Sequence, residues 1–428
     1  MKKYILAGLL ATTTLFVFGQ TKADELINAR EAERIEKVLS ADEMRGRKAF
    51  SPELEKAAVF IADEFKKNGL QPWNGSGSYL QEFVMVQPKF LGIEAQLDGS
   101  KADEKNMIVV TCLPDLQITE KSGYETAEIT NGDQLFSEAS RLARSGKNYI
   151  VRVDPSLAST FNRLTFLKRS LFKSETNTVF LLADKLPATY TIRARHEITE
   201  KKLANVVGVL PGKSRKDEYV IFSGHYDHIG VGRPVNGDSI YNGANDDAAG
   251  TTAVIMLSNY FKALGNNERT LVFAAFTAEE VGGYGSQYFS RQFDPAHVMA
   301  MFNIEMIGTD SKWGNNAAYI TGYEKTDMGK IMEKNLVGTG FTFYPDPYTD
   351  QQLFYRSDNA TLARLGVPAH TISTSKMDNE PNYHKPSDEL STLDMDNMAM
   401  IIKAIALSSR TIISGEDTPS RVDVTELR

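Results

Sequence analysis

Five short polar motifs combine side chains that could bind a metal ion or move a proton. Two contain histidine, two contain a pair of adjacent acids, and one contains a single glutamate. In chain order they are Gly224–His228, Tyr241–Gly250, Thr277–Ser286, Asn303–Met306 and Asn382–Asp388. Imidazole and carboxylate groups are ligands of zinc, and carboxylates also accept and donate protons. Together the motifs predict a metal site with an acid–base group beside it.

Most of these motifs have a simpler explanation when taken alone. Two aspartates that open an apolar helix are typical of an N-cap, and a lone histidine in a Pro-containing loop is usually a surface residue. Paired glutamates after an apolar strand are less easily explained, because burying adjacent carboxylates is costly unless cations neutralise them. As a set, the motifs offer two histidines and three acids as ligands: His225, His384, Asp246, Glu280 and Glu305.

This ligand set matches a pair of divalent ions that share one carboxylate. Nitrogen and oxygen donors without thiolate favour zinc, with Mn²⁺ or Co²⁺ as alternatives. Two ions ~3.5–4 Å apart can hold a water, lower its pKa and stabilise a tetrahedral intermediate. A further carboxylate must take the proton of that water, and Glu279 is left over for this role. Asp227 could accept a hydrogen bond from the second ring nitrogen of His225.

The motifs lie next to the elements that must position them. Strand-like apolar runs at Tyr219–Ser223, Leu271–Phe276 and Val298–Ile304 precede three motifs, and a helical pattern at Ala248–Leu264 follows a fourth. Strands that are apolar throughout are buried on both faces. Their alternation with helices predicts a three-layer α/β/α sandwich with a mostly parallel mixed central sheet. Ligands in such sheets gather beyond the carboxyl ends of the strands, so the motifs should converge.

The N-terminus has the pattern of a secretory signal. Lys2 and Lys3 precede an apolar run of 16 residues, Tyr4–Gly19, and small or polar residues follow. The run is short for a membrane span of ~20 residues, although an uncleaved anchor is the alternative. No later stretch is long enough to be a span. We therefore expect export, to the periplasm or out of the cell, without a stable membrane span after signal removal.

Composition excludes several classes of protein. A net charge of −7 gives no support to nucleic-acid binding. A single cysteine, Cys112, excludes an internal disulfide and a Cys-rich metal cluster. A length of 428 residues predicts more than one unit. The expected organisation is a signal peptide (1–23), the first part of a catalytic domain (24–95), an inserted smaller α/β subdomain (96–200), the main catalytic part (201–414) and a tail (415–428).

Around the motifs the sequence resembles the bimetallic zinc aminopeptidases, which include secreted bacterial leucine-type enzymes. The resemblance covers about Ala204–Ser409 and extends more weakly to Leu39–Arg47. It is carried by His-x-Asp, Asn-Asp-Asp-Ala-Ala-Gly, Glu-Glu-x-Gly-x-x-Gly-Ser and Tyr-His-x-Pro-x-Asp, together with the stretch from Ser357-Asp358 to Gly366-Val367-Pro368. It implies a peptidase that takes peptides with a free N-terminus and uses two Zn²⁺ per chain.

The resemblance also implies roles for individual residues. It makes Asp246 the bridging ligand, Glu280 and His384 the ligands of one ion, His225 and Glu305 those of the other, Glu279 the general base and acid, and Asp227 the support of His225. It further implies a cis peptide bond at Asp246–Asp247. Many family members have aspartate where this chain has Glu305, which is one methylene longer. This departure leaves the preference of the second metal position open.

Two other functions remain as alternatives. A glutaminyl cyclase-like enzyme on a similar fold works with one zinc and does not need His225. A non-catalytic binding protein on the same fold would have lost its ligands. The sequence does not define the specificity pocket, for which four aromatic residues are weak candidates: Tyr344, Tyr348, Phe354 and Tyr355. The oligomeric state and the role of the insert, which could be a protease-associated domain, are also left open.

Overall fold

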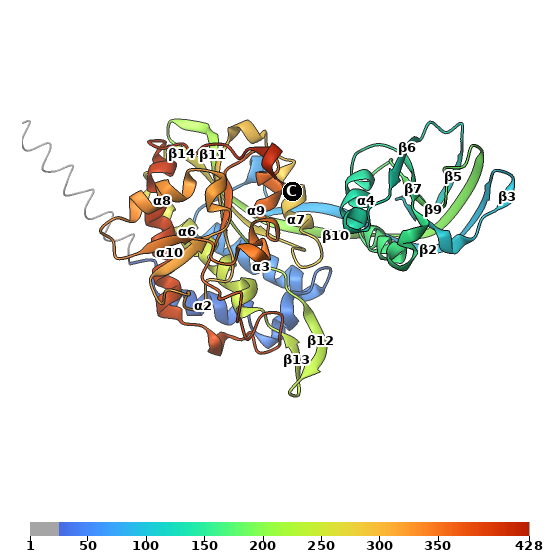
Figure 1. Ribbon diagram of the computed structural model, residues 1–428. Coiled ribbons are helices and arrows are strands. Elements are labelled where there is room, and N and C mark those ends of the chain that lie inside the picture. Colours follow the sequence, from blue (N-terminus) through green and yellow to red (C-terminus); the bar gives the residue numbers. More distant parts are fainter. Residues whose placement is uncertain (1–24, 428) are drawn as a thin grey trace, which may run out of the picture. The chain divides into compact units, whose positions relative to one another are not determined.

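The computed structural model describes residues 25–427, and the predicted signal peptide lies outside them. The chain forms two compact units (Figure 1). The larger unit comprises 25–82 and 203–427, and the smaller is Phe83–Lys202. The predicted insert, 96–200, falls inside the smaller unit, and its likeness to a protease-associated domain stays a prediction. No helix among the described residues has both the length and the apolar character needed to cross a membrane.

The larger unit is built on a mixed β-sheet with a parallel centre. Its strand order is β17 (Thr342–Pro345), β16 (Ala317–Ile320), β18 (Ala369–Ser373), β15 (Val298–Ile304), β11 (Arg215–His225), β14 (Arg269–Phe276) and the C-terminal part of β10 (Tyr190–Leu210). β18, β15, β11 and β14 are parallel neighbours, and β16 and β10 flank them antiparallel. The carboxyl ends of β11, β14 and β15 therefore lie beside one another, with His225 in register with Phe276.

Helices cover both faces of this sheet, which confirms the predicted α/β sandwich (Figure 1). α6 (Ala249–Leu264) packs on one face and is covered by α2 (Ala29–Leu39), α3 (Pro52–Lys67) and α10 (Met395–Ser408). α7 (Tyr284–Ser290) and α9 (Asn359–Ala363) cover the other face. Side chains of consecutive residues in β11 point to opposite faces of the sheet. Phe222 stacks on Phe261 of α6, whereas Ile221 packs with Phe289 of α7. α8 (Met328–Leu336) and α11 (Arg410–Ser414) pack against α10.

Burial on both faces explains why the central strands are apolar. All residues of β14 are buried, as the sequence pattern predicted for a parallel strand between two helical layers. The helix boundaries also follow local signals. Ser51 accepts a hydrogen bond from the N–H of Leu54 at 3.2 Å and Pro52 occupies the first turn of α3. Gly265, with φ +55°, ends α6 in the left-handed conformation that suits glycine.

The smaller unit has its own sheet and its own core. The strand order is β4 (Met107–Val110), β9 (Thr178–Leu182), β7 (Tyr149–Val153) and β6 (Glu125–Ile129), parallel except for β4. α4 (Leu135–Ala143) packs its buried face into this core. The strands β2 (Leu80–Leu97), β3 (Ser100–Lys101), β5 (Asp115–Thr119) and β8 (Leu171–Phe172) complete it with the first half of β10.

A fully buried arginine joins the N-terminal segment to two site-bearing loops. Arg47 donates hydrogen bonds to the main-chain carbonyls of Tyr226 at 2.7 Å, Asn242 at 2.7 Å, Gly243 at 2.9 Å and Leu39. Tyr226 follows the last residue of β11, and the Asn242–Gly243 pair precedes Asp246. The weakly matching motif of the sequence, Leu39–Arg47, therefore fixes the backbone on which the strongest motifs lie.

Burial of Glu36 near Arg47 gives the fold a predictable pH dependence. Burial raises the pKa of Glu36 to about 8, against the opposing effects of the Thr252 hydroxyl and the Arg47 charge. An unfolded glutamate has a pKa of ~4.3, so folding takes up a proton between these values. The free energy of unfolding contributed by Glu36 is therefore largest below pH ~4.3 and falls as pH rises through about 8.

A Glu36→Gln variant should lose this pH dependence. Glutamine keeps an acceptor for the Thr252 hydroxyl, which donates to Glu36 Oε1 at 2.9 Å, but it does not ionise. We expect the decrease in unfolding free energy between pH ~5 and ~8 to be smaller by on the order of 3 kcal/mol than in the wild type. Urea unfolding at several pH values measures this. The exposed Glu43→Gln is the control, and identical pH profiles for Glu36→Gln and wild type would contradict the assignment.

Candidate metal centre

The segment between β13 (Asp238–Tyr241) and α6 presents Asp246 to the carboxyl edge of the sheet. Its backbone N–H donates to Asp388 Oδ2 at 3.0 Å, and the N–H of Asn245 donates to Asp388 Oδ1 at 2.8 Å. The Asp246–Asp247 peptide bond is cis, as the resemblance implied. Asp247 accepts hydrogen bonds from the N–H groups of His225 (3.0 Å) and Met306 (3.1 Å), and so connects this loop to the ends of β11 and β15.

A first donor group consists of His225, Asp246 and Glu305, whose ligand atoms lie within 4.8 Å of one another. His225 is the last residue of β11 and Glu305 follows β15. His225 Nε2 is 3.2 Å from Asp246 Oδ1 and has no hydrogen-bond partner among the described residues. The hydroxyl of Ser357 donates to Glu305 Oε2, which orients this carboxylate. The unpartnered nitrogen and the two acids are the donors that a zinc ion prefers.

Asp227 is connected to this group mainly through the backbone. His225 Nδ1 lies 3.1 Å from the main-chain carbonyl of Asp227 and 3.8 Å from its carboxylate. A proton on Nδ1 directed to that carbonyl leaves the lone pair on Nε2, facing Asp246. The Asp227 carboxylate accepts from the N–H groups of Glu279 at 2.9 Å and Glu280 at 3.4 Å. It therefore holds the loop that carries both glutamates.

A second donor group lies on the other oxygen of Asp246. His384 Nε2 is 3.2 Å from Asp246 Oδ2 and 3.2 Å from Glu280 Oε2. A second imidazole, that of His228, also belongs here, because its Nδ1 is 2.7 Å from Glu280 Oε1. The sequence pattern predicted no role for His228, although this residue lies in the motif Gly224–His228. Asp246 is common to both groups, as expected of a bridging ligand.

The buried acids of the centre affect one another's protonation. Burial raises the pKa of Glu305 to about 7 and that of Asp227 to about 7. Burial, together with the charges of Glu305, Asp358 and Glu280, raises the pKa of Glu279 well above its ordinary value, although the His225 charge opposes it. Burial also opposes ionisation of Asp246, but its contacts with His225 and His384 lower its pKa. Excess negative charge of this kind is what divalent cations neutralise.

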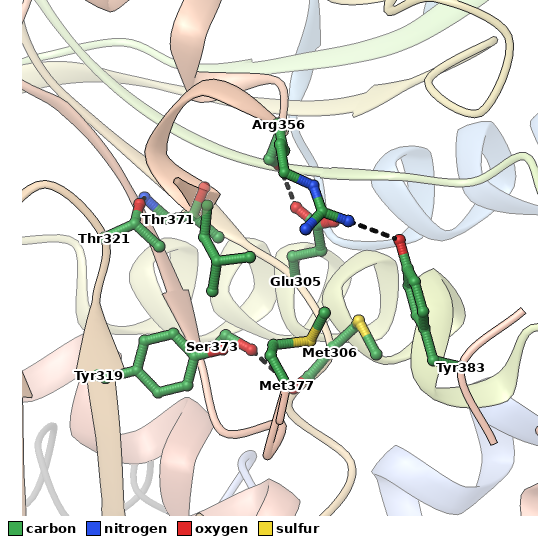
Figure 2. Close-up of a pocket in the computed structure, with 11 residues that line it drawn as sticks. Glu305, Met306, Tyr319, Thr321, Arg356, Thr371, Ser373, Met377 and Tyr383 are labelled. Carbon is green, nitrogen blue, oxygen red and sulfur yellow. Dashed lines mark hydrogen bonds between the residues drawn. The ribbon is translucent and has the colours of Figure 1, made fainter. Parts of the chain in front are cut away.

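A pocket opens beside Glu305. Eleven residues line it: Glu305, Met306, Tyr319, Thr321, Leu353, Arg356, Ser357, Thr371, Ser373, Met377 and Tyr383. Figure 2 shows Arg356 directed toward the Tyr383 hydroxyl, which lies 3.4 Å from its Nη2. The four aromatic candidates of the sequence are not in this lining, and Tyr348 and Phe354 are buried. The aromatic residues that do line it are Tyr319 and Tyr383.

The architecture and the donor set together define a candidate metal centre, and comparison with known proteins relates it to a family of peptidases. The family model described as Peptidase family M28 matches residues 205–408, which contain all the predicted ligands. The predicted ligands therefore all lie in a region of the chain that is similar to peptidase family M28.

Curated relatives match the same part of the chain. Leucine aminopeptidase 1 of Ajellomyces dermatitidis is 28% identical over 209 residues, which are 45% of this chain and 52% of that protein. A probable leucine aminopeptidase of Arthroderma benhamiae is 27% identical over 210 residues, 47% of this chain and 55% of that protein. The chain thus spans about half the length of the curated relatives it matches.

Solved structures share the fold over nearly the whole chain. An aminopeptidase from Aneurinibacillus sp. strain AM-1 superposes with a TM-score of 0.53 at 16% identity, covering 96% of this chain and 98% of that one. A Peptidase M28 precursor from Shewanella amazonensis gives a TM-score of 0.53 at 14% identity, covering 95% and 99%. These similarities support the α/β architecture derived above.

Proposed function

We propose that this chain is an exported zinc-dependent aminopeptidase that removes N-terminal residues from peptides with a free amino group. One observation carries the proposal: donor atoms from separate strand ends and loops form two groups that share Asp246. The match to peptidase family M28 and the names of the fungal relatives support it. Export, to the periplasm or the medium, is proposed from the signal-like sequence of residues 1–23.

In this proposal the five ligands hold two ions. His225 and Glu305 would bind one ion, Glu280 and His384 the other, and Asp246 both. The residues fit zinc because they supply only nitrogen and oxygen donors, and because the buried His225 Nε2 has no hydrogen-bond partner within residues 25–427. When bound, such a pair of ions lowers the pKa of a water and polarises the peptide carbonyl.

Glu279 would take the proton of that water and transfer it to the leaving amine. This role requires a carboxyl group that can hold a proton near neutral pH. The raised pKa of Glu279 supports it, and the hydrogen bond from its N–H to Asp227 fixes its backbone. Asp227 acts in the proposal as the residue that positions both the His225 ring and the Glu279 loop.

The pocket beside Glu305 would receive the side chain of the N-terminal residue. Its wall hydroxyls already have partners: Tyr319 donates to Ser375 O at 3.1 Å, and Thr371 to Asn359 Oδ1 at 2.9 Å. Met306 and Met377 add apolar surface. We therefore propose a preference for apolar N-terminal residues of leucine or methionine size, which agrees with the naming of the relatives as leucine aminopeptidases.

Metal removal and a substrate panel test the proposed function. The purified protein should contain two zinc ions per chain and cleave leucine and methionine arylamides, with activity falling at least ~100-fold after chelation and returning with Zn²⁺. Matched peptides with free and N-acetylated termini should differ, because only an aminopeptidase requires the free amine.

Other outcomes would support a different function. Release of ammonia from a Gln-initiated peptide without chain shortening would indicate a glutaminyl cyclase. Absence of both bound metal and hydrolysis would indicate a non-catalytic protein. Cleavage of acetylated peptides at the same rate would exclude exopeptidase action.

A further inference from the structure

His228 is a buried imidazole that the five-ligand set does not use. Its side chain is 1% exposed, and its Nδ1 lies 2.7 Å from Glu280 Oε1 and 3.9 Å from Asp246 Oδ2. Neither ring nitrogen makes a hydrogen bond among the described residues, so the approach of Nδ1 to Glu280 Oε1 is a close ion-pair contact. A buried imidazole that faces a single carboxylate oxygen of a candidate ligand needs an explanation, because unpartnered buried polar groups are costly.

The backbone around His228 fixes the position of its ring. Gly243 has φ +61°, and a Cβ atom at this position would lie 2.5 Å from His228 Cγ. The ring therefore packs directly on the main chain of the loop that carries Asp246. The N–H of His228 also donates to the main-chain carbonyl of Arg47 at 3.3 Å. These contacts leave little freedom to turn the ring away from Glu280.

The interatomic distances distinguish His228 from the ligands. Donor atoms that share one tetrahedral zinc ion, with metal bonds of ~2.0–2.1 Å, lie about 3.3 Å apart. His384 Nε2 meets this expectation, at 3.2 Å from both Asp246 Oδ2 and Glu280 Oε2. His228 Nδ1 departs from this expectation in both directions, because it is closer to Glu280 Oε1, at 2.7 Å, and farther from Asp246 Oδ2, at 3.9 Å.

We propose that His228 is a positioning residue for the second metal position. Its Nδ1, in contact with Glu280 Oε1 at 2.7 Å, would hold that oxygen in place and leave Oε2 directed toward His384. Partners of this kind fix the rotamer of a ligating carboxylate, and their removal typically lowers metal affinity ~10–100-fold. The inference rests on the proposed two-metal function and assigns a role to a residue outside its ligand set.

Zinc titration of metal-free protein tests this role. A competition titration against a chromophoric chelator should show two binding steps. The step that Glu280→Gln weakens is the second metal position. His228→Ala should weaken the same step by ~10–100-fold and leave the other within about threefold. His228→Asn should restore most of the affinity, because its amide nitrogen is as far along the side chain as Nδ1. His228→Gln should not, because its amide lies one bond farther out.

His196→Gln provides a matched control, since His196 is also a buried imidazole whose ring has no hydrogen-bond partner in the described part of the chain, but it lies in the smaller unit. It should change neither step. Equal affinities for His228→Ala and wild type would overturn the inference while leaving the proposed function intact. A loss above ~1,000-fold with an altered visible spectrum of the Co²⁺ form would also overturn it, because His228 would then be a ligand. A wild-type protein that binds no metal would refute both proposals.

Discussion

The Glu279→Gln variant is expected to bind both metal ions with wild-type affinity while kcat falls by ~10²–10⁴-fold. Glutamine has nearly the same volume, and the backbone hydrogen bond from residue 279 to Asp227 Oδ1 does not depend on the side chain. It has no carboxylate to accept a proton from water. Steady-state kinetics on a leucine arylamide, combined with a metal count per chain, measures both quantities.

The neighbouring Glu280→Gln substitution is the natural control. It makes the same chemical change one residue along the chain, in a side chain whose Oε2 lies 3.2 Å from His384 Nε2. We expect this variant to lose metal as well as activity. If Glu279→Gln kept more than about a third of wild-type kcat, or if it lost metal as Glu280→Gln does, Glu279 would not be the base.

Replacing Arg47 by methionine should reduce the free energy of unfolding by on the order of 4 kcal/mol. The guanidinium donates hydrogen bonds to four main-chain carbonyls, those of Leu39, Tyr226, Asn242 and Gly243. Each buried acceptor left without a donor costs ~1–3 kcal/mol, and relaxation of the chain or entry of water recovers part of the total. Urea denaturation of the metal-free protein measures the change without a contribution from bound ions.

Arg45→Met makes the same exchange two residues earlier, at an exposed position. It should change stability by no more than about 0.5 kcal/mol. If the two variants lost similar amounts of unfolding free energy, the loss at position 47 would reflect the removal of any arginine and not of the four carbonyl contacts.

The convergence of four candidate ligands, His225, Asp246, Glu280 and Glu305, could be predicted from local signals, whereas only the family resemblance placed His384 with them. His225 is the last residue of one apolar strand and Glu305 directly follows another. Because these strands are parallel, they end at the same edge of the sheet. Asp246 opens the helix that packs on that sheet. These are local signals combined with one general rule of topology, so no coordinates were needed to place the donors together.

Features that depend on packing between distant segments could not be predicted in this way. The sequence shows His228 three residues after His225, but not that its ring lies on Gly243 with Nδ1 toward Glu280. The carbonyl contacts of Arg47 are equally invisible, because main-chain acceptors carry no sequence signature. The pocket is a third case, since residues from several loops line it and helix-proximal aromatics such as Phe354 enter the core instead.

Strand β10 is longer than the apolar pattern of the sequence indicates, although the sequence does contain a signal for its first half. The apolar run Val206–Leu210 indicates only the last part of β10, which begins at Tyr190. Along its first half, buried Ile192 and Ala194 alternate with exposed Arg193 and Arg195. Alternation of this kind indicates a strand with one solvated face. Because charged residues interrupt this half of β10, it does not form a continuous apolar run.

The sharing of Asp246 by both donor groups restricts how such a centre can change over evolutionary time. In the proposed two-ion centre, loss of any other donor would remove one ion and leave a partial site on which selection could still act. Loss of Asp246 removes both positions in a single mutational step. Descendants that use one ion are therefore accessible through changes at His225, Glu305, Glu280 or His384, whereas lineages that lose the aspartate proceed directly to proteins without metal.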